Sequence, residues 1–172
     1  MPTSAFAGRG FFTTHLERVA EDLKTVIDFG PGEGTYSILG RHIAPNARWI
    51  GVEIFAPYIE RYDLDQKYDS VILSDLRYPE IRHDLSIFGD VLEHLPGPDV
   101  QRVLNVQAEL SQYIYVSVPI IHAPQGPSHG NDHEAHLYDW EFDEMSDLLL
   151  GLGPARWDAW RGHTVGRWWL DL

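Results

Sequence analysis

A regular alternation of short apolar segments with helical patterns constrains the fold of this chain more than any other feature. Five short apolar segments are predicted to be buried strands: 25–29, 48–52, 70–73, 85–88 and 113–118. Helical spacing predicts helices between or before them, at 15–23 (with Thr13 or Thr14 as a possible cap), 36–42, 57–62 and 99–111. Strands joined by helical crossovers pair in parallel. The pattern therefore predicts a doubly wound, Rossmann-like α/β fold.

The last third of the chain departs from this alternation. Segment 119–136 holds three prolines, two glycines and four histidines, which indicates a long loop of the kind that often forms a lid or a binding loop. A helix at 141–150 follows, and then two aromatic-rich strands at 156–160 and 164–170 form a hairpin. These additions predict a mostly parallel seven-stranded sheet with an antiparallel C-terminal hairpin strand. Strand alternation places Trp168 and Trp169 on opposite faces, so we expect one in the core and the other partly exposed.

Composition disfavours several classes of partner. The 172 residues fit one domain, 1–172, and carry a net charge of −13 without any basic run. Duplex nucleic acid and anionic membranes, which need clustered cations, are therefore disfavoured as partners. With no cysteine, no leader-like N-terminus and no long apolar stretch, the sequence predicts a soluble, cytoplasmic protein.

The stretch VIDFGPGEGTY places a glycine-rich loop between the first predicted strand and a helix. Such a loop lets the backbone approach a nucleotide-like ligand closely, although it is also compatible with a plain turn. Gly30, Gly32 and Gly34 give the spacing G-x-G-x-G, and Thr35 stands where a dinucleotide-binding loop needs its third glycine. No G-K-[ST] follows, so a P-loop is also excluded. The spacing argues against a nicotinamide-dependent oxidoreductase.

Two carboxylates end the next two predicted strands. Glu53 lies where a carboxylate can accept hydrogen bonds from a ribose diol, and Asp75 lies where the edge of an adenine ring would be. Each by itself could be a solvated strand-end residue. Because both fall beside the same loop, we interpret them as parts of one binding site.

In this order and spacing, DFGPGEGTY, GVEIF, SVILSDL and GDVLEHLPGPD resemble the successive motifs of class I S-adenosylmethionine-dependent methyltransferases. The nearest resemblance is to small stand-alone enzymes of actinobacteria and their phages. The resemblance implies the methyltransferase version of the Rossmann-like fold, with S-adenosylmethionine as cofactor. It also implies the cofactor contacts: Asp28, Gly30, Pro31, Gly32 and Gly34 at the methionine part, Glu53 with Ile54 at the ribose, Asp75 and Leu76 at the adenine, and Asp90 beside the sulfonium.

A second group of polar residues follows the fourth predicted strand. Asp90, Glu93 and His94 come from GDVLEHL, and His136 comes from HEAHLYDW. Two carboxylates and two imidazoles could bind Mg²⁺, Mn²⁺ or a similar ion. The pattern is similar to the E-x-x-E-H plus His metal site of small-RNA 3′-end 2′-O-methyltransferases and to a motif of quinone-biosynthesis O-methyltransferases, with the shorter Asp90 replacing a glutamate.

The alternative for the same residues needs no metal. His94 or His136 would act as a general base, or would line the acceptor pocket, with Glu93 beside them. His122, His129 and His133, with Asp132 and Glu134, are interpreted as part of a polar lid rather than as a separate metal site.

These features predict an enzyme that transfers a methyl group to a small-molecule acceptor, at a hydroxyl oxygen, with His94, His136 and Glu93 as the candidate catalytic residues. The alternative is a non-catalytic S-adenosylmethionine-binding module that regulates or scaffolds a partner. DNA-base methylation is disfavoured because no [DN]-P-P-[YF] tetrapeptide follows the fourth strand. The chain is short, so a second subunit of a homodimer could complete the acceptor site.

Overall fold

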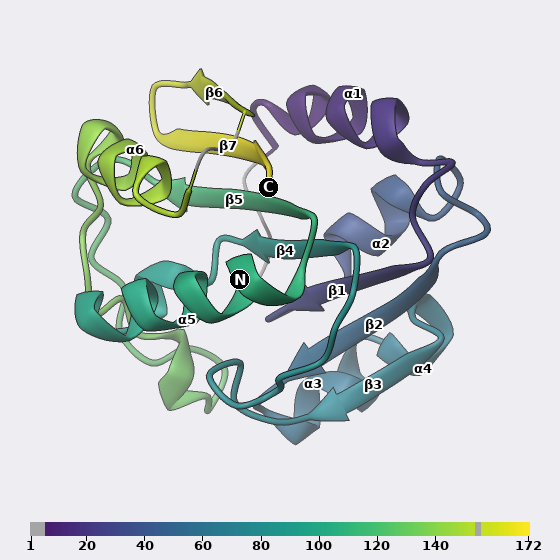
Figure 1. Cartoon of the computed structure of the whole chain (residues 1–172). Helices are drawn as coiled ribbons and strands as arrows, with labels where there is room; N and C mark the ends of the chain where they lie inside the picture. The colour runs from purple at the N-terminus through teal and green to yellow at the C-terminus, as the bar shows by residue number, and fades with distance from the viewer. Residues whose placement is uncertain (1–5, 154–155) are drawn as a thin grey trace.

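A seven-stranded sheet runs through the computed structural model, which describes residues 6–153 and 156–172 (Figure 1). The strand order is β3-β2-β1-β4-β5-β7-β6, in which β7 is antiparallel to both of its neighbours and the other pairs are parallel. The strands are β1 (Thr25–Phe29), β2 (Arg48–Glu53), β3 (Ser70–Leu73), β4 (Leu85–Gly89), β5 (Tyr113–Pro119), β6 (Arg156–Arg161) and β7 (Val165–Asp171). The predicted fold class is confirmed, and the strand bounds agree with the prediction within one residue.

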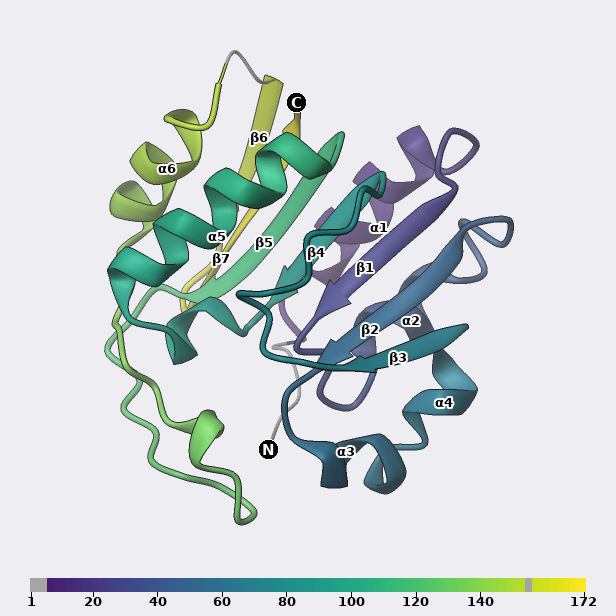
Figure 2. The ribbon, with the colours of Figure 1, turned by 60° about the horizontal axis from the view of Figure 1, so that its bottom comes forward.

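Helices cover both faces of this sheet (Figure 2). They are α1 (Arg9–Val19), α2 (Thr35–Gly40), α3 (Ala56–Arg61), α4 (Leu64–Lys67), α5 (Gly97–Leu110) and α6 (Phe142–Leu150), with short 3-10 helices η1 (Leu92–His94) and η2 (Asp132–Glu134). Helices α5 and α6 pack on one face, whereas α1, α2 and α4 pack on the other. No described helix is long and apolar enough to cross a membrane.

The first helix corrects a prediction. It begins after Gly8, in the left-handed conformation, and ends at Val19, so the predicted range 15–23 and the cap at Thr13 or Thr14 were wrong. Thr13 instead lies inside the helix, where its hydroxyl donates to the carbonyl of Gly10 at 3.2 Å. The extra N-terminal turn brings Phe12 against the rings of Tyr36 and Tyr115, at 5.0 and 4.9 Å. Tertiary packing of this aromatic ring outweighs the local capping signal. The four-residue α4 was not predicted, because one turn is too short to show a period.

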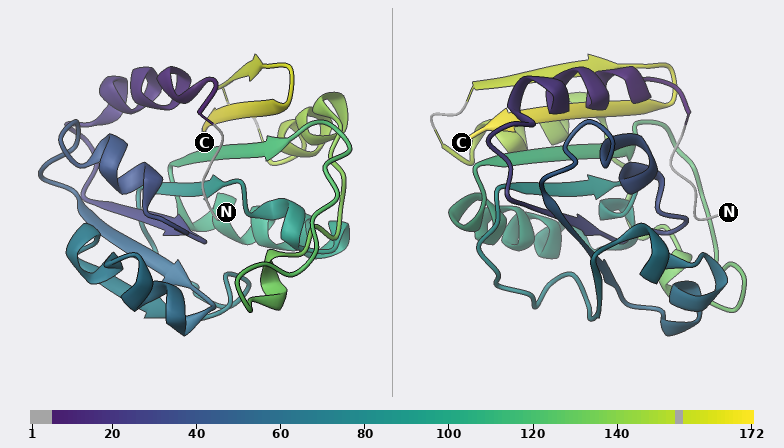
Figure 3. Two further views of the ribbon diagram at one scale, coloured as in Figure 1. Left: turned by 180° about the vertical axis from the view of Figure 1, so that it is seen from behind. Right: turned by 90° about the vertical axis from the view of Figure 1, so that its right-hand side faces the viewer.

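The two C-terminal tryptophans correct the prediction that one of them is partly exposed. Trp168 and Trp169 do face opposite sides of β7, but both are buried, at 0% and 1% exposure. Strand β7 lies inside the sheet, between β5 and β6, and helices α6 and α1 cover its two faces. Trp168 stacks on Phe142 of α6 at 4.9 Å, and Trp169 lies 6.4 Å from Phe12 of α1. Figure 3 shows α1 running along the β6–β7 hairpin, although these elements stand at opposite ends of the described chain.

The parallel strands bring their carboxyl ends to one edge of the sheet. The glycine-rich loop follows β1, Glu53 ends β2, and η1 follows β4 at this edge. The segment 119–136 lies at the same end of the molecule as α3 (Figure 2). Open α/β sheets bind ligands at this edge.

Candidate active site

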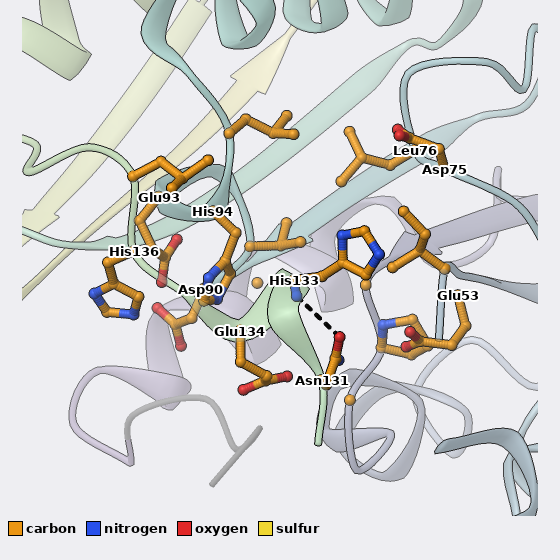
Figure 4. A pocket seen from close by; sticks show the side chains of 18 of the residues that line it. Glu53, Asp75, Leu76, Asp90, Glu93, His94, Asn131, His133, Glu134 and His136 are labelled. Carbon is orange, nitrogen blue, oxygen red and sulfur yellow. Dashed lines mark hydrogen bonds between the residues drawn. The ribbon is translucent and has the colours of Figure 1, made fainter. Parts of the chain in front are cut away.

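A cavity of about 460 Å³ opens at the carboxyl ends of the strands (Figure 4). Its volume is in the range of small-molecule sites. Its walls come from the loop after β1, the ends of β2 and β3, the β4–η1 segment and the 119–136 loop. Most of the predicted site residues line it: Gly30, Pro31, Gly32, Glu53, Ile54, Asp75, Leu76, Asp90, Glu93, His94 and His136.

The glycine-rich loop forms one wall because its backbone turns sharply there. Gly30 and Gly32 adopt φ values of 69° and 51°, a region that residues with a side chain rarely enter. A Cβ on Gly30 would come within 2.4 Å of Cγ2 of Val91. The amide of Gly30 donates to the carbonyl of Val52 at 2.9 Å, which ties the loop to β2. Bare backbone at this wall is what close contact with a nucleotide-like ligand requires.

Glu53 presents a buried carboxyl group at the end of β2. Its Oε1 accepts a hydrogen bond from the amide of Phe55 at 2.8 Å, and the residue is 4% exposed. Burial raises the pKa of Glu53 to about 7, against the opposing effect of backbone hydrogen bonds from Phe55 and its neighbours. The carboxyl group therefore titrates near neutral pH.

Asp75 lies at the same end of the cavity, with its carboxylate held by an arginine. The guanidinium of Arg77 contacts both oxygens of Asp75 and also reaches Asp99 at 2.8 Å. Burial would raise the pKa of Asp75, but the hydrogen bonds and charge of Arg77 outweigh it and lower the pKa. In Figure 4, Glu53, Asp75 and Leu76 lie together on one side of the cavity.

Two of the predicted cofactor residues are not among the described residues that line the cavity. Asp28 is 1% exposed beneath the glycine loop, where the hydroxyl of Tyr68 donates to its Oδ2 at 2.5 Å and its Oδ1 has no partner. Burial raises the pKa of Asp28 to about 7. Gly34, at φ 78°, is the residue that directly precedes α2.

The opposite side of the cavity holds a compact group of ligand-type atoms. One side-chain atom each of Glu93, His94 and His136 lies within 4.8 Å of the other two. The imidazole rings of His94 and His136 meet edge to face, with their centroids 4.9 Å apart. η1 supplies Glu93 and His94, and the end of the long loop supplies His136. Figure 4 shows these side chains together with Asp90, across the cavity from Glu53.

Hydrogen bonds to backbone carbonyl oxygens determine the tautomers of the two imidazole rings. Nδ1 of His94 lies 3.1 Å from the carbonyl oxygen of Ala135, and Nδ1 of His136 lies 2.6 Å from that of Ala123. A carbonyl oxygen only accepts, so each neutral ring carries its proton on Nδ1. Nε2 of each ring then keeps a free lone pair, which can accept a proton or bind a cation.

Burial favours the uncharged forms of Glu93 and His94. It raises the pKa of Glu93 well above its ordinary value, with a further increase from the charge of Asp90. It lowers the pKa of His94 to about 4. Oε2 of Glu93 is buried and has no hydrogen-bond partner. A divalent cation fits this donor set for two reasons. It would be the missing partner of Oε2 of Glu93, and imidazole nitrogens are common ligands of divalent transition-metal ions. Asp90 is not part of the three-residue group.

Asp90 follows β4 directly and lies on the same side of the cavity as His94 and His136 (Figure 4). It adopts the left-handed conformation at φ 55°, unusual for a residue other than glycine. Its amide donates to the carbonyl of Ser117 at 2.7 Å, and its Oδ1 accepts from the hydroxyl of Ser117 at 2.8 Å. The neighbouring strand β5 therefore fixes both its backbone and its side chain.

Sequence reasoning missed part of the cavity wall. Tyr58 of α3 and Asn131 of the long loop are each 2% exposed and line the cavity beside Glu134. The hydroxyl of Tyr58 has no hydrogen-bond partner. No motif marks these positions, because they meet only when the loop folds across to α3. Of the loop histidines, His133 lines the cavity, whereas His122 lies 2.6 Å from Asp139 in an exposed pair.

Comparisons with known proteins place this geometry in a structural class. No protein family matches the sequence, and no curated protein is significantly similar to it. Solved structures do match. The methyltransferase domain of bacterial CtHen1-CN gives a TM-score of 0.70 at 22% identity, over 95% of this chain and 96% of that one. The N-terminal domain of EvdMO1 with S-adenosylhomocysteine bound gives 0.69 at 12% identity, over 95% and 80%.

A third match is an O-methyltransferase family protein from Burkholderia thailandensis, with a TM-score of 0.61 at 12% identity. It covers 95% of this chain, which spans only 59% of that protein. Together with the strand order and the antiparallel β7, these likenesses define a class I S-adenosylmethionine-dependent methyltransferase fold. At such identities they show the fold and not the reaction.

Proposed function

We propose that the protein transfers the methyl group of S-adenosylmethionine to a hydroxyl oxygen of a small-molecule acceptor. The observation that carries this proposal is one continuous cavity that joins a bare glycine loop and Glu53 at one side to Glu93, His94 and His136 at the other. The sequence motifs and the fold support it. So do the S-adenosylhomocysteine in one similar structure and the O-methyltransferase family of another.

On this proposal the cofactor extends along the first side of the cavity. Glu53 accepts hydrogen bonds from the ribose hydroxyls, Asp75 and Leu76 border the adenine, and Gly30 with Gly32 faces the methionine part. The sulfonium then points toward Asp90, on the side of the cavity that holds His94 and His136. Its positive charge is favoured beside carboxylates that are themselves hydrogen-bonded.

The proposed reaction is an in-line displacement at carbon. The acceptor oxygen forms a bond to the methyl carbon, the carbon–sulfur bond breaks, and sulfur keeps the electron pair as the neutral thioether. The acceptor proton passes to a free Nε2, that of His94 or His136, each of which is held by a backbone carbonyl. The protein supplies position and proton removal.

A divalent cation held by Glu93, His94 and His136 is a second form of the same site. The 4.8 Å spacing of their ligand atoms and the unpartnered Oε2 of Glu93 favour it. A bound metal would lower the pKa of an acceptor hydroxyl. Titration with Mn²⁺ in a calorimeter tests it: the wild-type protein should bind the ion, and His136→Ala should not. Equal heats for both would contradict this form.

The proposed function itself is tested in two steps. Calorimetry should show binding of S-adenosylhomocysteine, and incubation with S-adenosylmethionine and a panel of hydroxyl-bearing compounds should then produce S-adenosylhomocysteine. A protein that binds the cofactor but converts it with no acceptor would support the alternative, a regulatory or scaffold module. The resemblance to actinobacterial and phage enzymes, the homodimer and the cytoplasmic location stay predictions.

A further inference from the structure

Arg167 is a fully buried arginine in the middle of the C-terminal half of the sheet. It stands on β7 opposite Ser117 of β5 and is 0% exposed. Its Nε and Nη2 donate to the carbonyl oxygen of Ala7 at 3.0 and 2.7 Å. Its Nη1 donates to the hydroxyls of Tyr36, Tyr115 and Ser117, at 3.1, 2.5 and 2.9 Å. Burying a cation costs free energy even when the cation is hydrogen-bonded. For stability alone, an apolar residue would therefore serve at least as well at this position.

The bond to Ser117 has a fixed direction. A guanidinium has only donors, so the oxygen of Ser117 accepts from Arg167 and its single proton is left for another acceptor. That acceptor is Oδ1 of Asp90, at 2.8 Å. The chain from guanidinium to hydroxyl to carboxylate is therefore polarised in one direction, and each bond strengthens the next.

Of the three residues linked by these hydrogen bonds, Asp90 is the one that is among the described residues lining the cavity. Ser117 also holds its backbone, through the 2.7 Å bond from the amide of Asp90. Asp90 adopts the left-handed conformation, which aspartate tolerates better than most residues with a side chain. The structure therefore maintains this carboxylate, with its negative charge, at a set position in the wall.

We propose that Arg167 and Ser117 are positioning residues that hold the Asp90 carboxylate toward the methyl donor and so set the preference for S-adenosylmethionine over S-adenosylhomocysteine. This inference rests on the proposed function. The two ligands differ by a methyl group and a positive charge. A fixed carboxylate stabilises the sulfonium and leaves the neutral thioether almost unaffected. The same contact favours release of the product.

The test compares the affinities of both ligands in variants of this chain, measured by calorimetry at one pH and ionic strength. Ser117→Ala should lower the preference for S-adenosylmethionine about three- to tenfold, the loss expected for part of one hydrogen bond to a charged group. Arg167→Met should change the ratio in the same direction. Arg167→Lys keeps the charge and should restore part of it.

Ser146→Ala is the matched control. Ser146 is also a buried serine beside β7, where it accepts from Nε1 of Trp168 at 2.9 Å and donates to the carbonyl of Phe142 at 2.7 Å. Its loss removes the same number of hydrogen bonds without reaching Asp90. The affinity ratio of this variant should equal that of the wild-type protein.

Each outcome decides something. A lower ratio in Ser117→Ala with an unchanged ratio in Ser146→Ala supports the inference. Equal losses of both affinities, or a ratio within twofold of wild type, in folded Ser117→Ala overturn it and leave the proposed function standing. A wild-type protein that binds neither ligand would contradict the proposed function and this inference together.

Discussion

The two sides of the cavity are built in different ways. The side with Glu53 and Asp75 is built mainly from the ends of neighbouring parallel strands and from one glycine loop, which lie in the first half of the chain. The side with Glu93 and His94 is completed by a loop that returns from far along the sequence. Nδ1 of His94 bonds to a carbonyl 41 residues away, and the amide of Leu137 donates to the carbonyl of Glu93 at 2.8 Å.

This difference separates what the backbone fixes from what the loop fixes. The side with Glu53 and Asp75 depends on strand register and on the positive φ values of the glycine loop. The side with Glu93 and His94 depends on how the 119–136 segment docks. Changes in the loop should therefore affect turnover and leave cofactor affinity nearly intact, whereas changes in the glycine loop should do the reverse.

The largest expected effect is on turnover. His136→Ala or His94→Ala should reduce the rate of methyl transfer at least about 100-fold, the usual contribution of a positioned proton acceptor, while the affinity for S-adenosylhomocysteine stays within about threefold. Single-turnover kinetics and calorimetry measure the two quantities. His122→Ala is the control, because His122 lies in the same loop but is exposed and paired with Asp139. Wild-type rates in both active-site variants would exclude them as proton acceptors.

Gly30→Ala tests the side of the cavity that the glycine loop forms with Glu53. A side chain here is strained at φ 69° and would collide with Val91, so we expect a total loss of about 2 to 4 kcal/mol between stability and cofactor affinity. Thermal unfolding and calorimetry together measure it. A Cβ on Gly126 of the long loop meets nothing within 4 Å, so Gly126→Ala should change neither quantity. Indistinguishable behaviour of the two variants would show that the loop tolerates side chains.

Glu53→Gln should weaken cofactor binding about tenfold at pH 8, because a carboxylate accepts hydrogen bonds from a diol more strongly than an amide does. The wild-type carboxyl group has a pKa of about 7, so its advantage over glutamine should shrink as the pH falls from 8 to 6. Affinities for S-adenosylhomocysteine across this range measure the trend. A constant ratio between the two proteins would mean that the charge of Glu53 plays no part.

The smallest effect is on stability. The pKa of Asp28 is about 7 in the folded protein and near 3.8 in the unfolded chain. Between pH 3.8 and pH 7, therefore, Asp28 is protonated in the folded state and ionised in the unfolded state. Stability contributed by this group is therefore present at low pH and falls as the pH rises toward 7. Asp28→Asn should raise the free energy of unfolding by on the order of 1 to 2 kcal/mol at pH 8 and change it little at pH 4. A loss of stability at both pH values would show that Tyr68 needs a carboxylate.

The residues on the Glu53 side of the cavity could be found in the sequence because their signals are local. A strand followed by Gly30 and Gly32, and strands that end in Glu53 and Asp75, carry their geometry in consecutive residues. Sequence reasoning also singled out Glu93, His94 and His136, which the structure brings together. It did not find Tyr58 or Asn131, because they meet across the cavity through a loop with no periodic pattern. The resemblance placed Asp28 at the cofactor; its carboxyl group accepts a hydrogen bond from Tyr68 and is not among the described residues that line the cavity, and its cofactor role stays a prediction.

The long reach of Arg167 has a consequence for how the protein forms. Its bonds to Ala7 join residues that are 160 positions apart in the sequence. Strand β7 is also the last strand in sequence order, although it lies between β5 and β6 in the sheet. Contacts of such sequence separation form late in folding, because the loop they close is long. On the ribosome the glycine loop and its neighbouring strands emerge first, and the anchor of Asp90 emerges near the end. A nascent chain can thus form the Glu53 side of the cavity before Arg167 is present to hold Ser117 and, through it, Asp90.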